Sequence, residues 1–330
     1  MPQILVEGLT KTYRVAERDP GVWGAAKGLF TRRWRTIEAL KGVDFSLDHG
    51  ELLGFIGPNG AGKSTTIKIL SGILRPSAGR CEIDGLTPWV DRIKHVGRIG
   101  VVFGQRTQLW WDLPVIEGFD LLRDIYRVPP DRYRRTRDEL VGLLRLERLL
   151  DQPVRQLSLG QRMRCEIAAA MLHEPRILFL DEPTIGLDAP SKLAVRDFVR
   201  TLNRDRGVTV ILTTHDMHDI EALAQRVIVI GNGTILADSP FEALRAGVLG
   251  ERRVFVDFAD EAPDLDLPGV TVRARDGKSL ELSFDPRQMT APQVISRITA
   301  LHAVDDIHVE QPAIEEVIAR FYDLHGANEA

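Results

Sequence analysis

The chain is predicted to fold as an α/β protein with a small α+β domain at its end. Three observations support this prediction. Short β-branched runs alternate with helical patterns, which is typical of a parallel sheet wrapped by helices. Runs near the start look like an antiparallel β subdomain, and apolar residues at three-to-four spacing over about 113–164 indicate a helical subdomain. A new series of strand and helix patterns begins near Gly250, so we expect domains at 1–250 and 251–330.

Each element of the first domain is indicated by its own pattern. Antiparallel strands are expected at 3–15 and 43–48. Helical patterns cover 116–126, 138–150 and 241–249. The Gly231-Asn232-Gly233 group marks a hairpin. Compact apolar runs predict strands buried on both faces at 51–57, 176–181 and 208–215.

The residues after 250 suggest a separate small domain. Asp276-Gly277 is expected to form its hairpin turn. Strand patterns flank this turn, and helical patterns follow it. The expected strands cover 252–258, 270–275, 278–284 and 306–311, and the expected helices cover 291–302 and 314–322.

Composition limits the class of protein. The 330 residues carry a formal net charge of −4, which argues against a nucleic-acid footprint over the whole protein. No apolar run approaches the roughly 18 residues that span a bilayer, and the N-terminal residues lack a secretory pattern, so the chain is expected to be cytoplasmic. Cys81 and Cys165 are far apart in sequence, which favours buried, reduced thiols over a disulfide.

The strongest chemical motif is a phosphate-binding loop. The stretch GPNGAGKST matches G-x-x-x-x-G-K-[ST], and it lies between a strand pattern and a helix pattern, as this motif requires. Its lysine is expected to reach the β- and γ-phosphates, and its serine hydroxyl to bind Mg²⁺. The fold expected around it is a P-loop NTPase (RecA-like) core. The motif comprises Gly57, Pro58, Asn59, Gly60, Ala61, Gly62, Lys63, Ser64 and Thr65.

Polar residues follow three of the expected strands. Asp181 and Glu182 end a buried apolar run, where a carboxylate is costly unless it serves a cation or a substrate. Asp181 suits Mg²⁺, and Glu182 is the expected general base that polarises the attacking water. His215 and Gln105 occupy the same kind of position, where open α/β sheets bind ligands. Either residue alone is equally compatible with a structural role.

The stretch LSLGQ, which includes Ser158, Gly160 and Gln161, stands at the start of an expected helix. The serine and the glycine N–H form a potential anion site there. The local alternative is a helix start that serves only its own fold. Leu159 stands where a second glycine is expected, although its N–H is retained.

In this order and spacing, the motifs resemble the nucleotide-binding subunit of the ATP-binding-cassette (ABC) family over about residues 3–249. The resemblance implies ATP hydrolysis with Mg²⁺, in a site shared head to tail by two cassettes that are expected to be identical. It further implies adenine stacking on Tyr13, Mg²⁺ binding by Gln105 and a switch role for His215. LSLGQ is the implied signature covering the neighbour's γ-phosphate, and Asp188 belongs to the implied IGLD motif.

The same resemblance implies separate membrane-spanning permease subunits, a place at the cytoplasmic face of the membrane and no direct nucleic-acid partner. The stretch GQRTQLWWDLP and an insertion after Tyr13 resemble the bacterial branch that exports drugs or other hydrophobic compounds. The alternative is a soluble family member that acts on DNA or the ribosome. Such forms usually carry two cassettes or a long coiled coil, and this chain has neither.

Two aromatic groups have two interpretations each. Trp23, Ala26, Phe30 and Trp34 recur at helical spacing among basic residues, so this segment either lies at a membrane interface or packs on its own domain. The Trp110-Trp111 pair beside Gln105 either contacts the membrane partner or belongs to the core. The charged run from Asp131 is expected to be a solvated helix face.

Overall fold

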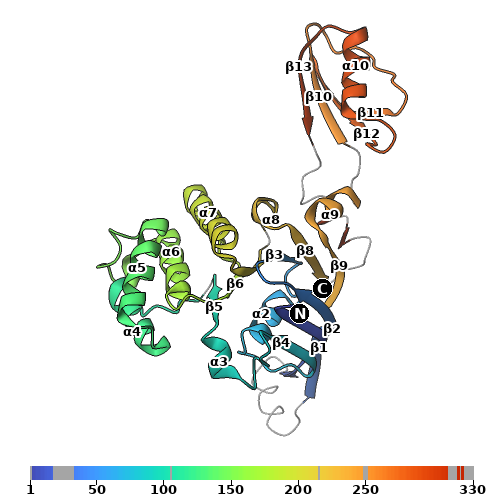
Figure 1. Ribbon diagram of the computed structural model, residues 1–330. Helices are drawn as coiled ribbons and strands as arrows, with labels where there is room; N and C mark the ends of the chain where they lie inside the picture. The colour runs from blue at the N-terminus through green and yellow to red at the C-terminus, as the bar shows by residue number, and fades with distance from the viewer. Residues whose placement is uncertain are drawn as a thin grey trace, which may run out of the picture. The chain divides into compact units, whose positions relative to one another are not determined.

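The computed structural model divides into two compact units, one over Met1–Phe241 and one over Glu242–Asn328 (Figure 1). The boundary expected at residue 250 falls in the stretch 248–251, which is outside the described residues. The described residues are 2–17, 33–104, 106–214, 216–247, 252–310, 318–319 and 321–322.

The first unit is built around a six-stranded sheet. Its first five strands are parallel, and only the last is antiparallel to its neighbour. The three runs expected to be buried on both faces do form strands with every residue buried, namely β3, β6 and β7. In spatial order the strands are β5 (Ile99–Phe103), β6 (Ile177–Asp181), β7 (Thr209–Thr213), β3 (Leu52–Ile56), β8 (Arg226–Gly231) and β9 (Thr234–Pro240).

Helices pack on this sheet, and three of them begin shortly after the carboxyl end of a parallel strand. Helix α2 contacts β6, α3 contacts β5, α7 contacts β7 and α8 contacts β3. Gly207 ends α7 in the left-handed conformation, with φ 64°, which glycine adopts without steric cost. The helices are α2 (Lys63–Leu70), α3 (Arg92–Val96), α7 (Ala189–Arg206), α8 (Met217–Leu223) and, across the division between the units, α9 (Phe241–Gly247).

An antiparallel sheet of three strands, in the order β2-β1-β4, lies beside the phosphate loop. Its strands are β1 (Ile4–Glu17), β2 (Arg33–Leu47) and β4 (Ala78–Ile83). Trp34 belongs to β2, where it pairs with Ala16 and is 55% exposed, so the helical spacing expected there was wrong for this residue. Extended pairing with β1 overrides the local spacing. Trp23, Ala26 and Phe30 lie outside the described residues.

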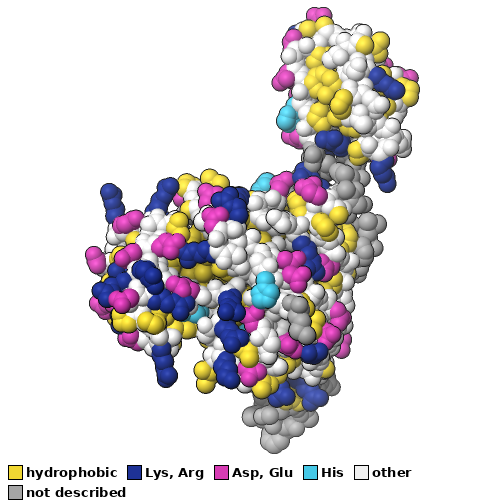
Figure 2. Space-filling view, viewed as in Figure 1, with side chains coloured by type: hydrophobic (Ala, Val, Ile, Leu, Met, Phe, Trp, Pro, Cys, Tyr) yellow, Lys and Arg dark blue, Asp and Glu magenta, His cyan; other side chains and the backbone are white. Residues whose placement is uncertain are grey.

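Three helices form the helical part of the first unit: α4 (Val115–Tyr126), α5 (Pro130–Leu144) and α6 (Leu159–Met171). A short 3₁₀ turn, η1 (Val154–Gln156), precedes α6. The apolar spacing predicted a helix as far as residue 150, but Arg145 takes a left-handed backbone with φ 54° and ends α5. Charged side chains of both signs are interspersed over these helices in Figure 2, as expected for a solvated surface.

The expected hairpin between β8 and β9 is present. Asn232 and Gly233 both have positive φ, 48° and 81°, which fits a type I′ turn. The Gly233 N–H donates to the Ala61 carbonyl of the phosphate loop at 3.1 Å. A Cβ added at Gly233 would lie 2.9 Å from the Ala39 carbonyl oxygen, so only glycine fits between the loop and β2.

The second unit is a four-stranded antiparallel sheet with α10 (Ala291–Leu301) packed against it. The expected hairpin at Asp276-Gly277 is present, and Gly277 has φ 56°. Most of the helix expected at 314–322 lies outside the described residues. In spatial order the strands are β11 (Val270–Asp276), β12 (Ser279–Phe284), β10 (Arg252–Phe258) and β13 (Val304–Glu310).

Both cysteines are buried, as expected, and neither forms a disulfide. Cys81 lies in β4 and Cys165 lies in α6. Burial raises the pKa of each thiol to about 12, because the thiolate loses its hydration in the core. Each thiol therefore behaves as a small apolar side chain.

A buried histidine connects the end of α6 to β5. The His173 ring stacks on Tyr126, with the ring centroids 3.9 Å apart, and its Nε2 lies 2.9 Å from the Ile99 carbonyl oxygen. That oxygen accepts only, so Nε2 carries the hydrogen in this contact. Burial lowers the pKa of His173 to about 4, because the interior disfavours the imidazolium.

This histidine should make stability fall in mild acid. Its folded pKa is depressed, so its contribution is complete above the unfolded value of 6.5 and is lost as pH falls toward 4. By pH 5 the loss is about 2 kcal/mol. His173→Phe keeps an aromatic ring against Tyr126 but cannot titrate. Urea unfolding at pH 7.5 and pH 5 should show a smaller loss for the variant, and an equal loss in both proteins would contradict this account.

Candidate functional site

The phosphate loop runs from the end of β3 to the start of α2. Gly62 has φ 113°, and a Cβ there would lie 2.7 Å from the Leu40 side chain and 2.8 Å from the Ala39 carbonyl oxygen. Gly57 is equally confined, because a Cβ there would lie 2.4 Å from the Ile230 carbonyl oxygen. The loop therefore requires glycine at both positions and leads its backbone directly into the N-terminus of α2.

The remaining residues of the motif differ in their exposure to solvent. Asn59 and Gly60 are exposed, and Pro58 is half-buried. The Ala61 N–H donates to the Pro58 carbonyl oxygen at 3.2 Å, which closes the turn of the loop. Thr65 is half-buried in the first turn of α2.

Lys63 is held under the loop. Its side chain is only 5% exposed, and its Nζ donates to the Gly57 carbonyl at 2.6 Å and to the Pro58 carbonyl at 3.1 Å. Burial lowers the pKa of Lys63, while the charges of Glu182 and Asp181 oppose this shift. A buried ammonium held by two carbonyl oxygens is a strong donor for a phosphate oxygen that reaches the loop.

Asp181 connects the loop to the sheet. Its Oδ1 accepts hydrogen bonds from Ser64 Oγ at 3.1 Å and from Thr213 Oγ1 at 2.6 Å. Thr213 belongs to none of the motifs recognised in the sequence. Its position at the end of the apolar run 208–215 was the available signal, because Asp181 and Thr213 are partners at the ends of the parallel strands β6 and β7. The serine hydroxyl and the carboxylate are oxygen ligands of the kind that Mg²⁺ prefers.

Glu182 has a strained backbone. Its φ is 56°, in the left-handed region, which is uncommon for a residue with a side chain. Its N–H donates to the Thr213 carbonyl at 2.9 Å and faces Thr213 Oγ1 at 3.2 Å. From β5, Gly104 approaches so closely that a Cβ there would lie 2.2 Å from the Glu182 carbonyl oxygen. The ends of β5, β6 and β7 together hold Glu182 in this conformation.

Two predicted residues, Gln105 and His215, lie outside the described residues, although the residues next to each are described. Tyr13 lies in β1 opposite Ile37 and is half-buried. The Lys11 ammonium is 5.2 Å from the centre of the Tyr13 ring. This distance is within the range of a cation–π contact.

The residues at the start of α6 form a capping box. Ser158 is its N-cap, and its Oγ accepts from the Gln161 N–H at 3.2 Å. In return, the Gln161 side chain accepts from the Ser158 N–H at 2.9 Å. This capping box satisfies two donors that the helix start would otherwise leave open. The local interpretation of LSLGQ thus has a physical basis, and Ser158 still remains exposed.

The starts of α6 and α7 are packed together. Asp188 is the N-cap of α7 and accepts from the Ser191 N–H at 3.3 Å; hydrogen bonds from Ser191 lower the pKa of Asp188. A Cβ added at Gly160 would lie 2.2 Å from Ser191 Oγ, so glycine permits this contact. A Cβ added at Gly186 would lie 3.0 Å from Leu159 Cδ2. Leu159 itself is 37% exposed.

The Trp110-Trp111 pair lies on the surface, with 40% and 49% of the two residues exposed, so the core interpretation is wrong. The Trp111 carbonyl accepts from the Arg155 N–H at 3.0 Å. The Arg162 guanidinium lies 5.7 Å from the centre of the Trp111 ring. These contacts fix the segment while leaving part of each indole accessible.

Comparison with known proteins identifies relatives over most of the chain. The family model described as ABC transporter matches residues 40–185. A daunorubicin resistance ATP-binding protein of Streptomyces coeruleorubidus is 34% identical over 302 residues, which cover 87% of this chain and 92% of that protein. A Nod factor export ATP-binding protein of Ralstonia nicotianae is 32% identical over 295 residues, which cover 88% and 90% of the two chains.

Solved structures of similar chains include the following two. One is a dimeric ATP-binding cassette in a post-hydrolysis state bound to ADP and Pi. It superposes with a TM-score of 0.60 at 28% identity, over 72% of this chain and 98% of that one. The other is cbiO1 from Clostridium perfringens, part of the transporter complex cbiONQ. Its TM-score is 0.60 at 27% identity, over 74% of this chain and 91% of that one.

The packing of α6 against α7 can be tested with two glycines. Gly160→Ala should destabilise the protein by about 1–3 kcal/mol, because the new methyl group meets Ser191. Gly142→Ala in α5 is the matched control. Nothing lies within 4 Å of a Cβ at that position, so the change should stabilise by about 0.5–1 kcal/mol.

Adding Ser191→Gly should recover part of the loss from Gly160→Ala, as a double-mutant cycle of denaturant unfolding measures. Additive effects of the two substitutions would show that the two helix starts do not press on each other.

Proposed function

This chain belongs to the ABC transporter ATPases, and we propose that it powers the export of hydrophobic compounds through separate membrane-spanning subunits. As a member of that family it binds and hydrolyses ATP. The names of the relatives from Streptomyces coeruleorubidus and Ralstonia nicotianae, which refer to drug resistance and to export, support the direction of transport. Among the described residues, no helix has the length and apolar character needed to cross a bilayer.

The observation that carries the catalytic part of the proposal is the contact between Ser64 Oγ and Asp181 Oδ1 beside the buried Lys63. The Lys63 ammonium and two oxygen ligands, from Ser64 and Asp181, therefore lie together beside the phosphate loop. In this arrangement Lys63 and the loop bind the β- and γ-phosphates. Glu182, the residue after Asp181, then accepts a proton from the attacking water.

The residues present fit a magnesium ion. Ser64 and Asp181 supply a neutral and a charged oxygen 3.1 Å apart, close enough to bind one small cation together. Mg²⁺ bound there neutralises charge on the phosphate oxygens. By the family resemblance, Gln105 would be a further ligand and His215 would have the switch role.

We propose that two copies of the chain share each site. The exposed Ser158 and the N–H of Gly160 of one copy then bind the γ-phosphate held by the other copy, and Tyr13 stacks on adenine within its own copy. The dimeric cassette among the similar structures supports this arrangement. The capping box uses Ser158 Oγ as an acceptor, so its O–H can donate to a phosphate oxygen held by the other copy.

We propose that the exposed indoles of Trp110 and Trp111 contact the membrane-spanning subunits and that the chain lies at the cytoplasmic face of the membrane. Partly exposed aromatic side chains held by neighbouring contacts are the residues that most often dominate interfaces. The residues after 250 form no part of the described catalytic cluster. We assign them to regulation or stabilisation of the dimer.

The role of Glu182 can be tested by Glu182→Gln, which keeps the shape of the side chain and removes its basicity. Turnover should fall by about 10²–10⁴-fold, while Mg-ATP still binds and an ATP-bound dimer accumulates. Lys63→Ala is the contrasting variant and should lose ATP binding itself. Phosphate release and equilibrium nucleotide binding measure the two effects. Near-normal hydrolysis by Glu182→Gln would overturn the assignment of the base.

A mixed dimer tests whether the site is shared. Lys63→Ala disables the loop of its own copy, and Ser158→Arg should disable the site held by its neighbour, so each variant alone should be nearly inactive. In a mixed dimer the intact Lys63 of one copy meets the intact Ser158 of the other. ATPase activity should therefore be partly restored on mixing.

Subunit exchange is confirmed first by co-purification through a tag on one variant. With mixed dimers present, no gain in activity over the separate variants would favour the local capping role of Ser158.

A further inference from the structure

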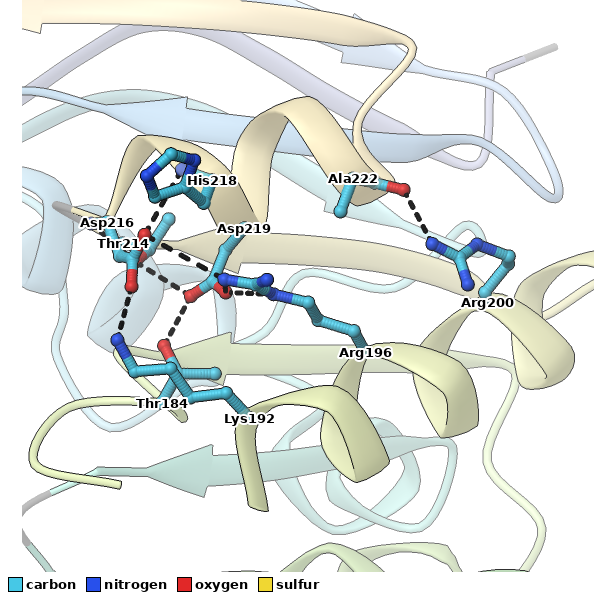
Figure 3. Close-up of polar contacts among 9 residues, drawn as sticks. All are labelled: Thr184, Lys192, Arg196, Arg200, Thr214, Asp216, His218, Asp219 and Ala222. Atoms are coloured by element: carbon cyan, nitrogen blue, oxygen red, sulfur yellow. Dashed lines mark hydrogen bonds and ion pairs between the residues drawn. The ribbon is translucent and has the colours of Figure 1, made fainter. Parts of the chain in front are cut away.

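A buried carboxylate outside the phosphate site connects three segments that meet at the catalytic edge. Asp219 of α8 has no exposed surface. Its Oδ1 lies 2.5 Å from both Nε and an Nη of Arg196, which belongs to α7 (Figure 3). Its Oδ2 accepts from the hydroxyl of Thr184 and, at 3.3 Å, from the hydroxyl of Thr214. A buried carboxylate requires such a set of donors, since an uncompensated charge there is costly.

The three partners of Asp219 lie on segments that also carry proposed site residues. Thr184 is two residues after Glu182, and Thr214 immediately precedes His215. One carboxylate oxygen therefore accepts hydrogen bonds from the segment that carries the proposed base and from the segment that carries the proposed switch residue. Arg196 attaches the same carboxylate to α7, the helix that begins at Asp188.

A second acidic residue extends the network. Asp216 forms an ion pair with Lys192 at 2.5 Å, and its Oδ1 is 3.8 Å from Arg196. The Asp216 N–H donates to Thr214 Oγ1 at 2.9 Å, and its Oδ1 accepts from the His218 N–H at 3.1 Å. The residues on both sides of His215 are therefore held through α7.

We propose that Asp219, paired with Arg196, is a positioning residue that fixes the Glu182 and His215 segments relative to each other. The inference rests on the proposed roles of Glu182 and His215. Asp219 touches neither the phosphate loop nor the Ser64–Asp181 contact in this structure. Its effect on turnover is exerted through Thr184, Thr214 and the Arg196 guanidinium. Loss of this carboxylate should therefore lower kcat while leaving nucleotide affinity nearly unchanged.

Asp219→Asn keeps the size of the side chain and removes its charge. We expect kcat for ATP hydrolysis to fall at least tenfold, with the Kd for Mg-ATP changed less than threefold. Thr184→Val is the milder second variant, because it leaves the Asp219–Arg196 ion pair intact, and it should lower kcat in the same direction. Arg200→Gln is the matched control. Arg200 lies one turn further along α7, and among the described residues it bonds the Ala222 carbonyl of α8, at 3.1 Å, and its helix neighbour Asp197, at 2.9 Å.

A double variant in which both partners are neutral distinguishes a positioning role of Asp219 from an effect on stability. Asp219→Asn combined with Arg196→Gln leaves no unpaired buried charge, so its melting temperature should recover relative to Asp219→Asn alone. Under the proposal kcat stays low in this double variant. Recovery of kcat together with the melting temperature would overturn the proposal, as would an equal loss of kcat in Arg200→Gln or a Kd that rises as much as kcat falls.

The outcome is distinguishable from failure of the proposed function. If the unaltered chain hydrolyses ATP and Glu182→Gln does not, the proposed function stands whatever the Asp219 variants do. Normal kcat in both Asp219→Asn and Thr184→Val would then reject only the positioning role.

Discussion

The site depends on a single carboxylate oxygen, Asp181 Oδ1, which receives hydrogen bonds from two different segments. Ser64 reaches it from the helix after the phosphate loop, and Thr213 reaches it from the neighbouring strand. The parallel register of β6 and β7 brings Asp181 and Thr213 level, so the geometry follows from the sheet. This shared acceptor joins the helix after the loop to the strand ends at the point where phosphates are expected to bind.

The strained backbone of Glu182 follows from the same junction. Its N–H is held by Thr213 on one side, and Gly104 crowds its carbonyl on the other. A left-handed backbone costs about 1–3 kcal/mol for such a residue, and it persists here because two strands determine it. The fully buried strands β6 and β7 thus support one unfavourable conformation at the edge of the sheet, while the helical part supplies the exposed Ser158.

Local patterns were sufficient for the central strands, the phosphate loop and both hairpin turns. An apolar run of five or six residues between turn signals leaves few alternatives to a buried strand. Contacts between distant residues were not accessible in the same way. Thr213 and Asp181 are 32 positions apart, and Arg196 and Asp219 are 23 apart, so each pair forms only once the sheet has its order. Local spacing also misled at Trp34 and at the end of α5, where strand pairing and a left-handed Arg145 prevailed.

The state of the two cysteines has a practical consequence for spectroscopy. With a pKa of about 12, Cys81 and Cys165 hold almost no thiolate at neutral pH, and thiolate is the form that reacts with maleimides and alkylating spin labels. A cysteine introduced at an exposed position such as Leu159 would therefore take up a probe selectively in the native sequence background. Separations between two copies of the chain then become measurable without first replacing either natural thiol.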